Sequence, residues 1–292
     1  MNSVTVRVPA TTANLACGFD TVGCALSLYN TLSFTLSDTL SFTGCDEEFQ
    51  TPDNLAFRGF DAVYAHLGRP APAVRIDISS DIPVCRGLGS SAAMLAAGAA
   101  AANALSGAGL PKADLLSIVT PIEGHPDNLA PAFFGGLVAS SLCDGRVWSA
   151  SYPVHASLRF VVLSPDYTLS THAARAALPA SVPFADAVYD LSRLALLPRA
   201  FESGDEEMLA LCLSDRLHQP YRRSLIPGFD EVRSLASALG CGAFCISGAG
   251  PSLLCVSRDP ELAHDLSSAV SALPNSWHVR DLRVDPGGAM LL

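Results

Sequence analysis

The stretch that decides the fold is residues 83–93, which read P-V-C-R-G-L-G-S-S-A-A. An alternating strand pattern ends just before it, and an alanine-rich helix is predicted to begin within it and to end near Ser106. Its two glycines let the backbone pass close to a ligand. The free amides and the dipole of a helix N-terminus favour an anion such as polyphosphate. The alternative is a tight strand-to-helix turn with a serine cap, and this stretch alone leaves both interpretations open.

Residues 83–93 differ from the two commonest phosphate-binding loops. The G-K-[ST] of a Walker loop occurs nowhere in the chain, and the third glycine of G-x-G-x-x-G is absent. A dinucleotide-binding dehydrogenase is therefore disfavoured, since the acidic residue that its βαβ unit requires is missing as well. Ser90 and Ser91 instead add hydroxyls that can reach phosphate or a bound Mg²⁺.

A second polar segment, residues 123–131, reads E-G-H-P-D-N-L-A-P between apolar neighbours. Such an irregular turn is a favourable place for a site. Glu123 is a candidate Mg²⁺ ligand, because Mg²⁺ takes few carboxylates and keeps several waters. The alternative is a helix C-terminus followed by an Asn/Asp turn.

Two further segments are weak signals when taken singly. Residues 9–20 read P-A-T-T-A-N-L-A-C-G-F-D, and residues 240–252 read G-C-G-A-F-C-I-S-G-A-G-P-S. The first contains small polar residues with one Asn and one Asp. The second is interpreted, by itself, as a glycine-rich turn between two strands.

Composition excludes several classes of protein. Hydrophobic residues make up 49% and charged residues 16% of the 292, which excludes a disordered chain. The net charge is −10 and the only lysine is Lys112, so no basic face for nucleic acid is expected. No stretch resembles a signal peptide or a membrane span, and the 9 cysteines lack zinc spacing. We expect a cytoplasmic protein without nucleic-acid or membrane partners.

Strands and helices interleave without regular βα alternation, which favours an α+β fold. The expected strands are residues 4–8, 25–36, 73–78, 135–140, 147–152, 158–163, 242–247, 252–257 and 277–283. The expected helices are residues 54–67, 91–106, 112–122, 171–177, 184–202, 205–213 and 260–272, and Asp53 and Asn54 are the candidate N-caps of the first. Pro9 is expected to stop the first strand. A change in pattern near residue 155 divides the chain into an N-terminal part (1–155) and a C-terminal part (156–292).

Taken together, these segments resemble the signature motifs of the galacto-, homoserine, mevalonate and phosphomevalonate (GHMP) kinases over nearly the whole chain. Residues 83–93 are similar to the phosphate loop of that superfamily, P-x-x-x-G-L-G-S-S-A-A. Residues 11–23 (T-T-A-N-L-A-C-G-F-D-T-V-G), 123–131 and 215–227 (D-R-L-H-Q-P-Y-R-R-S-L-I-P) resemble the homoserine kinase branch in particular.

The resemblance implies two domains, an N-terminal one like ribosomal protein S5 that binds ATP and a C-terminal ferredoxin-like one. It implies ATP and Mg²⁺ as cofactors, with Ser91 and Glu123 as metal ligands, and a homodimer. It also implies phosphorylation of the side-chain hydroxyl of L-homoserine, in threonine biosynthesis. The residues implied to bind ATP are Pro83, Arg86, Gly87, Leu88, Gly89, Ser90, Ser91 and Ala92.

The residues implied to bind the amino acid are Asn14, Asp20, His125, Asn128, Thr171, Arg175, Arg222 and Gly248. The chemistry of homoserine agrees with this set. Two arginines suit the carboxylate, because a planar guanidinium pairs bidentately, and Asp20 suits the ammonium. Without the resemblance, Arg175 and Arg222 would be interpreted as surface helix residues and His125 as a turn cap.

The expected catalytic residues are Asn128, Asp127 and Arg175. If the reaction uses a base, Asp127 is the candidate. The resemblance implies that homoserine kinases work without a dedicated base, and we expect that here, with Asn128 orienting the hydroxyl. Lys112 lies outside every motif, so no catalytic lysine is expected. The alternatives are a GHMP-type kinase for another small carboxylate-bearing alcohol and a non-catalytic regulatory relative.

Overall fold

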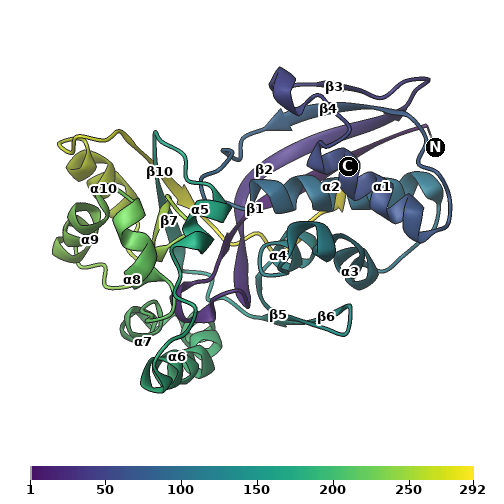
Figure 1. The fold of residues 1–292 in the computed structure, drawn as a ribbon. Helices are drawn as coiled ribbons and strands as arrows, with labels where there is room; N and C mark the ends of the chain where they lie inside the picture. The colour runs from purple at the N-terminus through teal and green to yellow at the C-terminus, as the bar shows by residue number, and fades with distance from the viewer. Residues whose placement is uncertain (1) are drawn as a thin grey trace.

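The computed structural model describes residues 2–292 and contains two β-sheets, each covered by helices (Figure 1). The seven-stranded sheet has the order β11-β1-β2-β4-β3, and β5 pairs with both β2 and β6. Its strands are β1 (Ser3–Ala13), β2 (Val22–Leu36), β3 (Ser41–Thr43), β4 (Val74–Ser80), β5 (Leu137–Cys143), β6 (Arg146–Tyr152) and β11 (Met290–Leu291). The helices on it are α1 (Leu55–His66), α2 (Ser90–Ser106), α3 (Lys112–Glu123) and α4 (Leu129–Phe134).

The four-stranded sheet has the order β10-β7-β9-β8 and is antiparallel throughout. Its strands are β7 (Arg159–Pro165), β8 (Phe244–Ile246), β9 (Leu253–Ser257) and β10 (Trp277–Leu282). The helices of this part are α5 (Thr171–Ala176), α6 (Phe184–Ser203), α7 (Glu206–Cys212), α8 (Gln219–Arg222), α9 (Phe229–Ala238) and α10 (Leu262–Val270). Three 3-10 turns complete the chain, η1 (Ala16–Gly18), η2 (Glu47–Phe49) and η3 (Arg223–Leu225). The α+β class predicted from the sequence is confirmed.

The prediction that Pro9 stops the first strand is wrong. Strand β1 continues to Ala13, and its register against β2 shifts between Pro9 and Ala10. A proline lacks the amide that a regular ladder needs, so the irregularity falls where the donor is missing. The strand past the shift is fully buried and delivers Asn14 to the interior of the molecule.

Helix α2 is a small-residue helix in the centre of the larger core. It packs so closely on α1 that a Cβ at Gly98 would overlap the carbonyl oxygen of Ala56 and lie 2.8 Å from the amide nitrogen of Phe60. Gly107 ends it in a left-handed conformation, at the position the sequence predicts. The helix is therefore held against α1 along its length and ends at Gly107, and its N-terminus faces the site.

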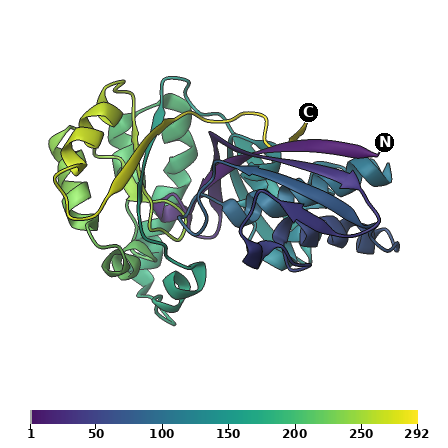
Figure 2. The same cartoon turned by 90° about the horizontal axis from the view of Figure 1, so that it is seen from above.

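The C-terminal residues return to the first sheet. Strand β11 pairs with β1 through Val6 with Leu291 and Arg7 with Met290, and both chain ends lie on this side of the molecule (Figure 2). The division near residue 155 stays a prediction. Among residues 2–292, no helix has the length and the apolar character that crossing a membrane requires.

Candidate active site

A cleft of ≈ 700 Å³ gathers residues from seven separate segments of the chain. The residues predicted as site residues that line it are Asn14, Asp20, Pro83, Arg86, Gly87, Gly89, Ser90, Ser91, Glu123, His125, Asp127, Asn128, Thr171, Arg175, Arg222 and Gly248. Leu88 and Ala92 do not line it, because their side chains are buried in the core. The fold thus brings together motifs from distant parts of the chain; Asn14 and Gly248 are 234 positions apart.

The glycines of the phosphate loop meet other parts of the backbone. Gly87 and Gly89 have φ of +71° and +67°, in the left-handed region that favours glycine. A Cβ at Gly87 would overlap the carbonyl oxygen of Ser247, and one at Gly89 would overlap the hydroxyl of Thr11. Helix α2 begins directly after Gly89 and has no side-chain cap. The serine-cap alternative is therefore wrong, and the first amides of a 17-residue helix are left for an anion.

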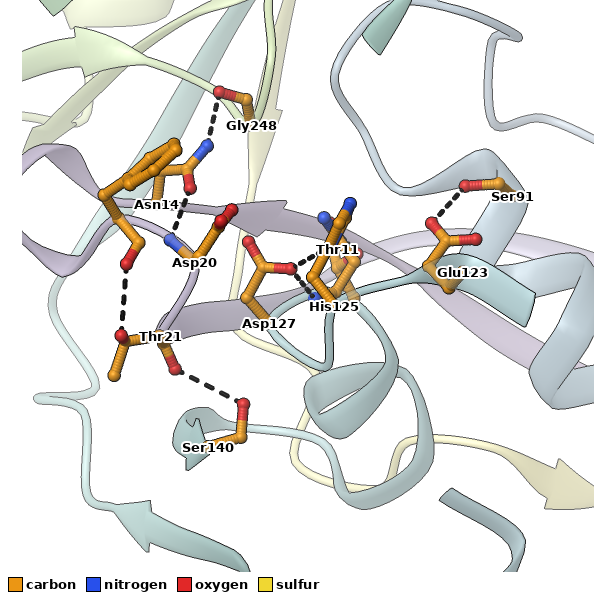
Figure 3. A network of polar contacts seen from close by, with 12 residues as sticks. Thr11, Asn14, Asp20, Thr21, Ser91, Glu123, His125, Asp127, Ser140 and Gly248 are labelled. Carbon is orange, nitrogen blue, oxygen red and sulfur yellow. Dashed lines mark hydrogen bonds and ion pairs between the residues drawn. The ribbon is translucent and has the colours of Figure 1, made fainter. Parts of the chain in front are cut away.

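Ser91 and Glu123 place two hard oxygen atoms side by side in the cleft. The hydroxyl of Ser91 donates a hydrogen bond to Oε1 of Glu123 at 2.6 Å (Figure 3). Burial raises the pKa of Glu123, and the hydrogen bond from Ser91 opposes that shift. A hydroxyl and a desolvated carboxylate fit a divalent cation that takes its other ligands from water and phosphate. No group of three or more His, Cys, Asp or Glu side chains within residues 2–292 forms an all-protein metal site.

Asp127 is buried, and one of its two carboxylate oxygens orients two neighbouring residues. Its Oδ1 accepts from the ring nitrogen Nδ1 of His125 at 2.6 Å and from the amide of Asn128 at 3.0 Å (Figure 3). Burial lowers the pKa of His125, but the hydrogen bond and the charge of Asp127 outweigh burial, so the net shift is upward. Thr11 donates to Oδ1 of Asn128 at 2.8 Å. The amide nitrogen of Asn128 is thereby the end of the side chain that is left to donate.

Asp20 and Arg175 form a bidentate ion pair, with distances of 2.9 and 2.8 Å. The backbone of Asp20 is held in turn, because its amide donates to Oδ1 of Asn14 and Nδ2 of Asn14 donates to the carbonyl of Gly248 (Figure 3). Asn14 and Asp20 both have positive φ. Such conformations persist only where the surroundings fix them, and they concentrate at binding sites.

Arg222 is 1% exposed, so it is not a surface helix residue. Its guanidinium donates to the carbonyl oxygens of Ala174 and Gly248 at 3.2 and 3.3 Å. Burial, followed by the nearby charge of Arg175, lowers the pKa of Arg222. None of the ion pairs among residues 2–292 includes it. A buried cation without a carboxylate partner is costly and calls for an anion.

One wall of the cleft has no counterpart in the sequence prediction. It is formed by residues of η2, the start of α1 and the end of β4, among them Glu48, Phe49, Asn54 and Ile82, with Met94 on α2. Asn54 was expected only as the cap of α1, a role it fills by accepting from the amide of Ala56. The residues of this wall belong to no polar motif of the sequence. They lie beside the phosphate loop only because the folded chain brings them there.

Comparison with known proteins shows which family the chain belongs to. Residues 54–136 match the family model "GHMP kinases N terminal domain", and residues 195–275 match "GHMP kinases C terminal". The homoserine kinase of Clostridium botulinum (strain Okra / Type B1) is 38% identical over 291 residues, covering 99% of this chain and 98% of the relative. That of Crocosphaera subtropica is 40% identical over 305 residues, covering 99% and 97%.

Two solved structures have the same fold as this chain. The crystal structure of homoserine kinase from Cytophaga hutchinsonii superposes with a TM-score of 0.90 at 28% identity, covering 100% of this chain and 98% of that one. L. major mevalonate kinase, at 13% identity and a TM-score of 0.75, covers 96% of this chain and 95% of its own and shares the fold.

The fold and the phosphate loop thus define a GHMP kinase, as the sequence motifs predicted. Its identity to curated relatives over almost its whole length then shows that the chain belongs to the homoserine kinases.

Proposed function

We propose that this enzyme transfers the γ-phosphoryl group of ATP to the side-chain hydroxyl of L-homoserine and releases O-phospho-L-homoserine. The observation that carries the proposal is Arg222, a buried guanidinium without a carboxylate partner that faces the same cleft as the phosphate loop. A cleft that needs an anion at one end and offers an anion site at the other fits a carboxylate-bearing acceptor and a nucleotide. The names of the relatives supply homoserine as the particular acceptor.

ATP is proposed to lie with its phosphates at residues 86–91, against the uncapped N-terminus of α2. The helix dipole and the free amides there stabilise negative charge. Ser91 and Glu123 would hold Mg²⁺, since their adjacent oxygens suit it. The ion supplies charge neutralisation at the phosphates. Arg86 is already bound to the carbonyls of Pro165 and Asp166, so it is proposed to fix the loop that it belongs to.

The amino acid is proposed to enter between Asp20 and Arg175. Its ammonium replaces Arg175 as the partner of Asp20, and its carboxylate takes Arg175 and Arg222. One ion pair is exchanged for three, so the cost of opening the pair is offset only by a ligand that carries both charges. Asn14, Thr171 and Gly248 line this end of the cleft and complete the polar surroundings.

The acceptor hydroxyl is proposed to be oriented by Asn128, whose amide nitrogen is left to donate. Phosphoryl transfer depends on positioning and charge stabilisation more than on covalent help. Both hydrogen bonds recorded for Asp127 go to Oδ1, where it holds His125 and the backbone of Asn128. We propose that the hydroxyl loses its proton late and directly to an oxygen of the transferring phosphoryl group, with Asp127 as an orienting group.

An Asp127→Asn variant tests the absence of a base. We expect kcat to fall by about one order of magnitude, because orientation of Asn128 is weakened and no proton acceptor is lost. Steady-state kinetics with saturating ATP measures it. A loss of nearly all kcat with unchanged binding of L-homoserine would show that Asp127 is the base.

The acceptor itself is tested by a coupled ADP-release assay with ATP and Mg²⁺. The acceptors to compare are L-homoserine, L-threonine, L-serine, mevalonate and galactose. Turnover largely confined to L-homoserine supports the proposal. Preference for another alcohol would leave the phosphate loop in place and refute the amino-acid site, and ATP binding without turnover would favour a regulatory relative.

The proposal includes a homodimer in the cytoplasm. Helix α6 exposes apolar side chains at Phe184, Val188 and Leu191, spaced four and three residues apart along one stripe. Light scattering after gel filtration gives the mass in solution, and a monomer at micromolar concentration would refute the dimer.

A further inference from the structure

One aromatic ring lies beside both arginines of the cleft. The guanidinium carbon of Arg222 is 5.1 Å from the centre of the Phe19 ring, and that of Arg175 is 5.7 Å from it. The two cations are close enough for the charge of Arg175 to act on Arg222, so they repel each other. The face of an aromatic ring attracts a cation within about 6 Å of its centre. The Phe19 ring therefore lies within attractive distance of both cations.

The Phe19 ring is itself held by a buried histidine. The rings of Phe19 and His218 stack with their centres 5.2 Å apart and an interplanar angle of 24°. Nε2 of His218 lies 3.1 Å from the carbonyl oxygen of Ala16 and must carry the proton, since that oxygen can only accept. This leaves a lone pair on Nδ1, 3.5 Å from Nη1 of Arg222. Burial lowers the pKa of His218 to about 4, so no third cation is added.

The backbone around both rings is fixed as well. One oxygen of Asp215 accepts from the amides of Leu217, His218 and Gln219 at 3.0, 2.6 and 3.2 Å, at the turn from which α8 carries Arg222. Phe19 directly precedes Asp20, the partner of Arg175. The ring is therefore joined covalently to one side of the acceptor site and packed against the other.

We propose that Phe19, supported by the stacked ring of His218, is a positioning residue that sets the spacing of Arg175 and Arg222 for the two oxygens of the acceptor's carboxylate. The inference rests on the proposed function, in which both arginines bind that carboxylate. Phe19 does not line the cleft, so it acts through the arginines and not on the substrate. Neither Phe19 nor His218 belongs to the set of site residues that the motifs predict.

The test compares Phe19→Leu with Phe19→Tyr, which keeps the ring. We expect Phe19→Leu to raise the KM for L-homoserine by about tenfold and to leave the KM for ATP unchanged, because only the arginine pair is loosened. Phe19→Tyr should stay within about twofold of the wild type. His218→Gln removes the supporting ring and should raise the same KM, which provides a second route if Phe19→Leu does not fold.

The matched control is Phe201→Leu. Phe201 stacks on Phe160 at 6.0 Å in the core and does not line the cleft, so its loss should lower Tm and leave the KM for L-homoserine unchanged. An unchanged homoserine KM in both Phe19→Leu and His218→Gln overturns this proposal alone. An equal rise in both KM values would also overturn it, by showing a merely structural role. If the wild type neither binds L-homoserine in calorimetry nor phosphorylates it, the proposed function fails first.

Discussion

Arg222 shows how much depends on the shape of one side chain. Its guanidinium spans the carbonyls of Ala174 and Gly248, which belong to two separate segments beside the cleft. A planar fork can make these bonds and still face a carboxylate, whereas an ammonium is a compact point charge. The sequence places this arginine in a motif, but its burial depends on α5 and on the glycine-rich loop, which lie far away in the chain.

We expect Arg222→Lys to raise the KM for L-homoserine by about 10- to 100-fold, since bidentate pairing is lost while the positive charge stays. The KM for ATP should change little. Steady-state kinetics with each substrate varied in turn measures both constants. A homoserine KM within twofold of the wild type would contradict the role of Arg222 in binding the carboxylate.

Helix α2 demonstrates which parts of an element can be predicted. Its start after Gly89 and its end at Gly107 follow from local signals, and so does the cap of α1 at Asn54. Strand β1 beyond Pro9 and helix α4 do not, because the first is stabilised by pairing with β2 and the second begins inside a polar turn. Local preferences predict element ends well and fail where a distant partner stabilises the backbone.

Because α1 and α2 are in close contact at Gly98, we expect alanine there to have an effect opposite to its usual one in a helix. Replacement of a mid-helix glycine by alanine favours an isolated helix by about 1 kcal/mol. Here the added Cβ overlaps the carbonyl of Ala56, so we expect Gly98→Ala to lower the free energy of unfolding by about 1 to 3 kcal/mol. Urea unfolding measures it, and a stabilised variant would show that the two helices can move apart freely.

We expect Asp190 to make the free energy of unfolding of the whole molecule depend on pH. This carboxyl is 2% exposed, and its Oδ1 accepts from the amide of Arg216 at 3.0 Å. Its Oδ2 has no partner among residues 2–292. Burial is the largest cause that raises the pKa of Asp190 from 3.8 to about 6. The folded chain therefore binds this proton more tightly than the unfolded chain does, and the resulting stabilisation is lost as the pH rises through about 6.

Asp190→Asn keeps the acceptor for Arg216 and removes the titration. Between pH 5 and pH 8 we expect the wild type to lose about 1 kcal/mol of unfolding free energy relative to this variant. Urea titrations of both proteins at the two pH values measure the difference, in which the other titrating groups cancel. Parallel pH profiles for the two proteins would contradict the raised pKa.

Strand β11 binds the edge of β1, so the two ends of a long chain meet in one ladder. On the ribosome, residues 2–13 emerge long before residues 290–291 do. Throughout synthesis, therefore, β1 presents an open edge to other nascent chains, and the larger sheet is completed only after translation has passed Leu291. Until then, the unpaired edge of β1 is a place where another strand can add wrongly.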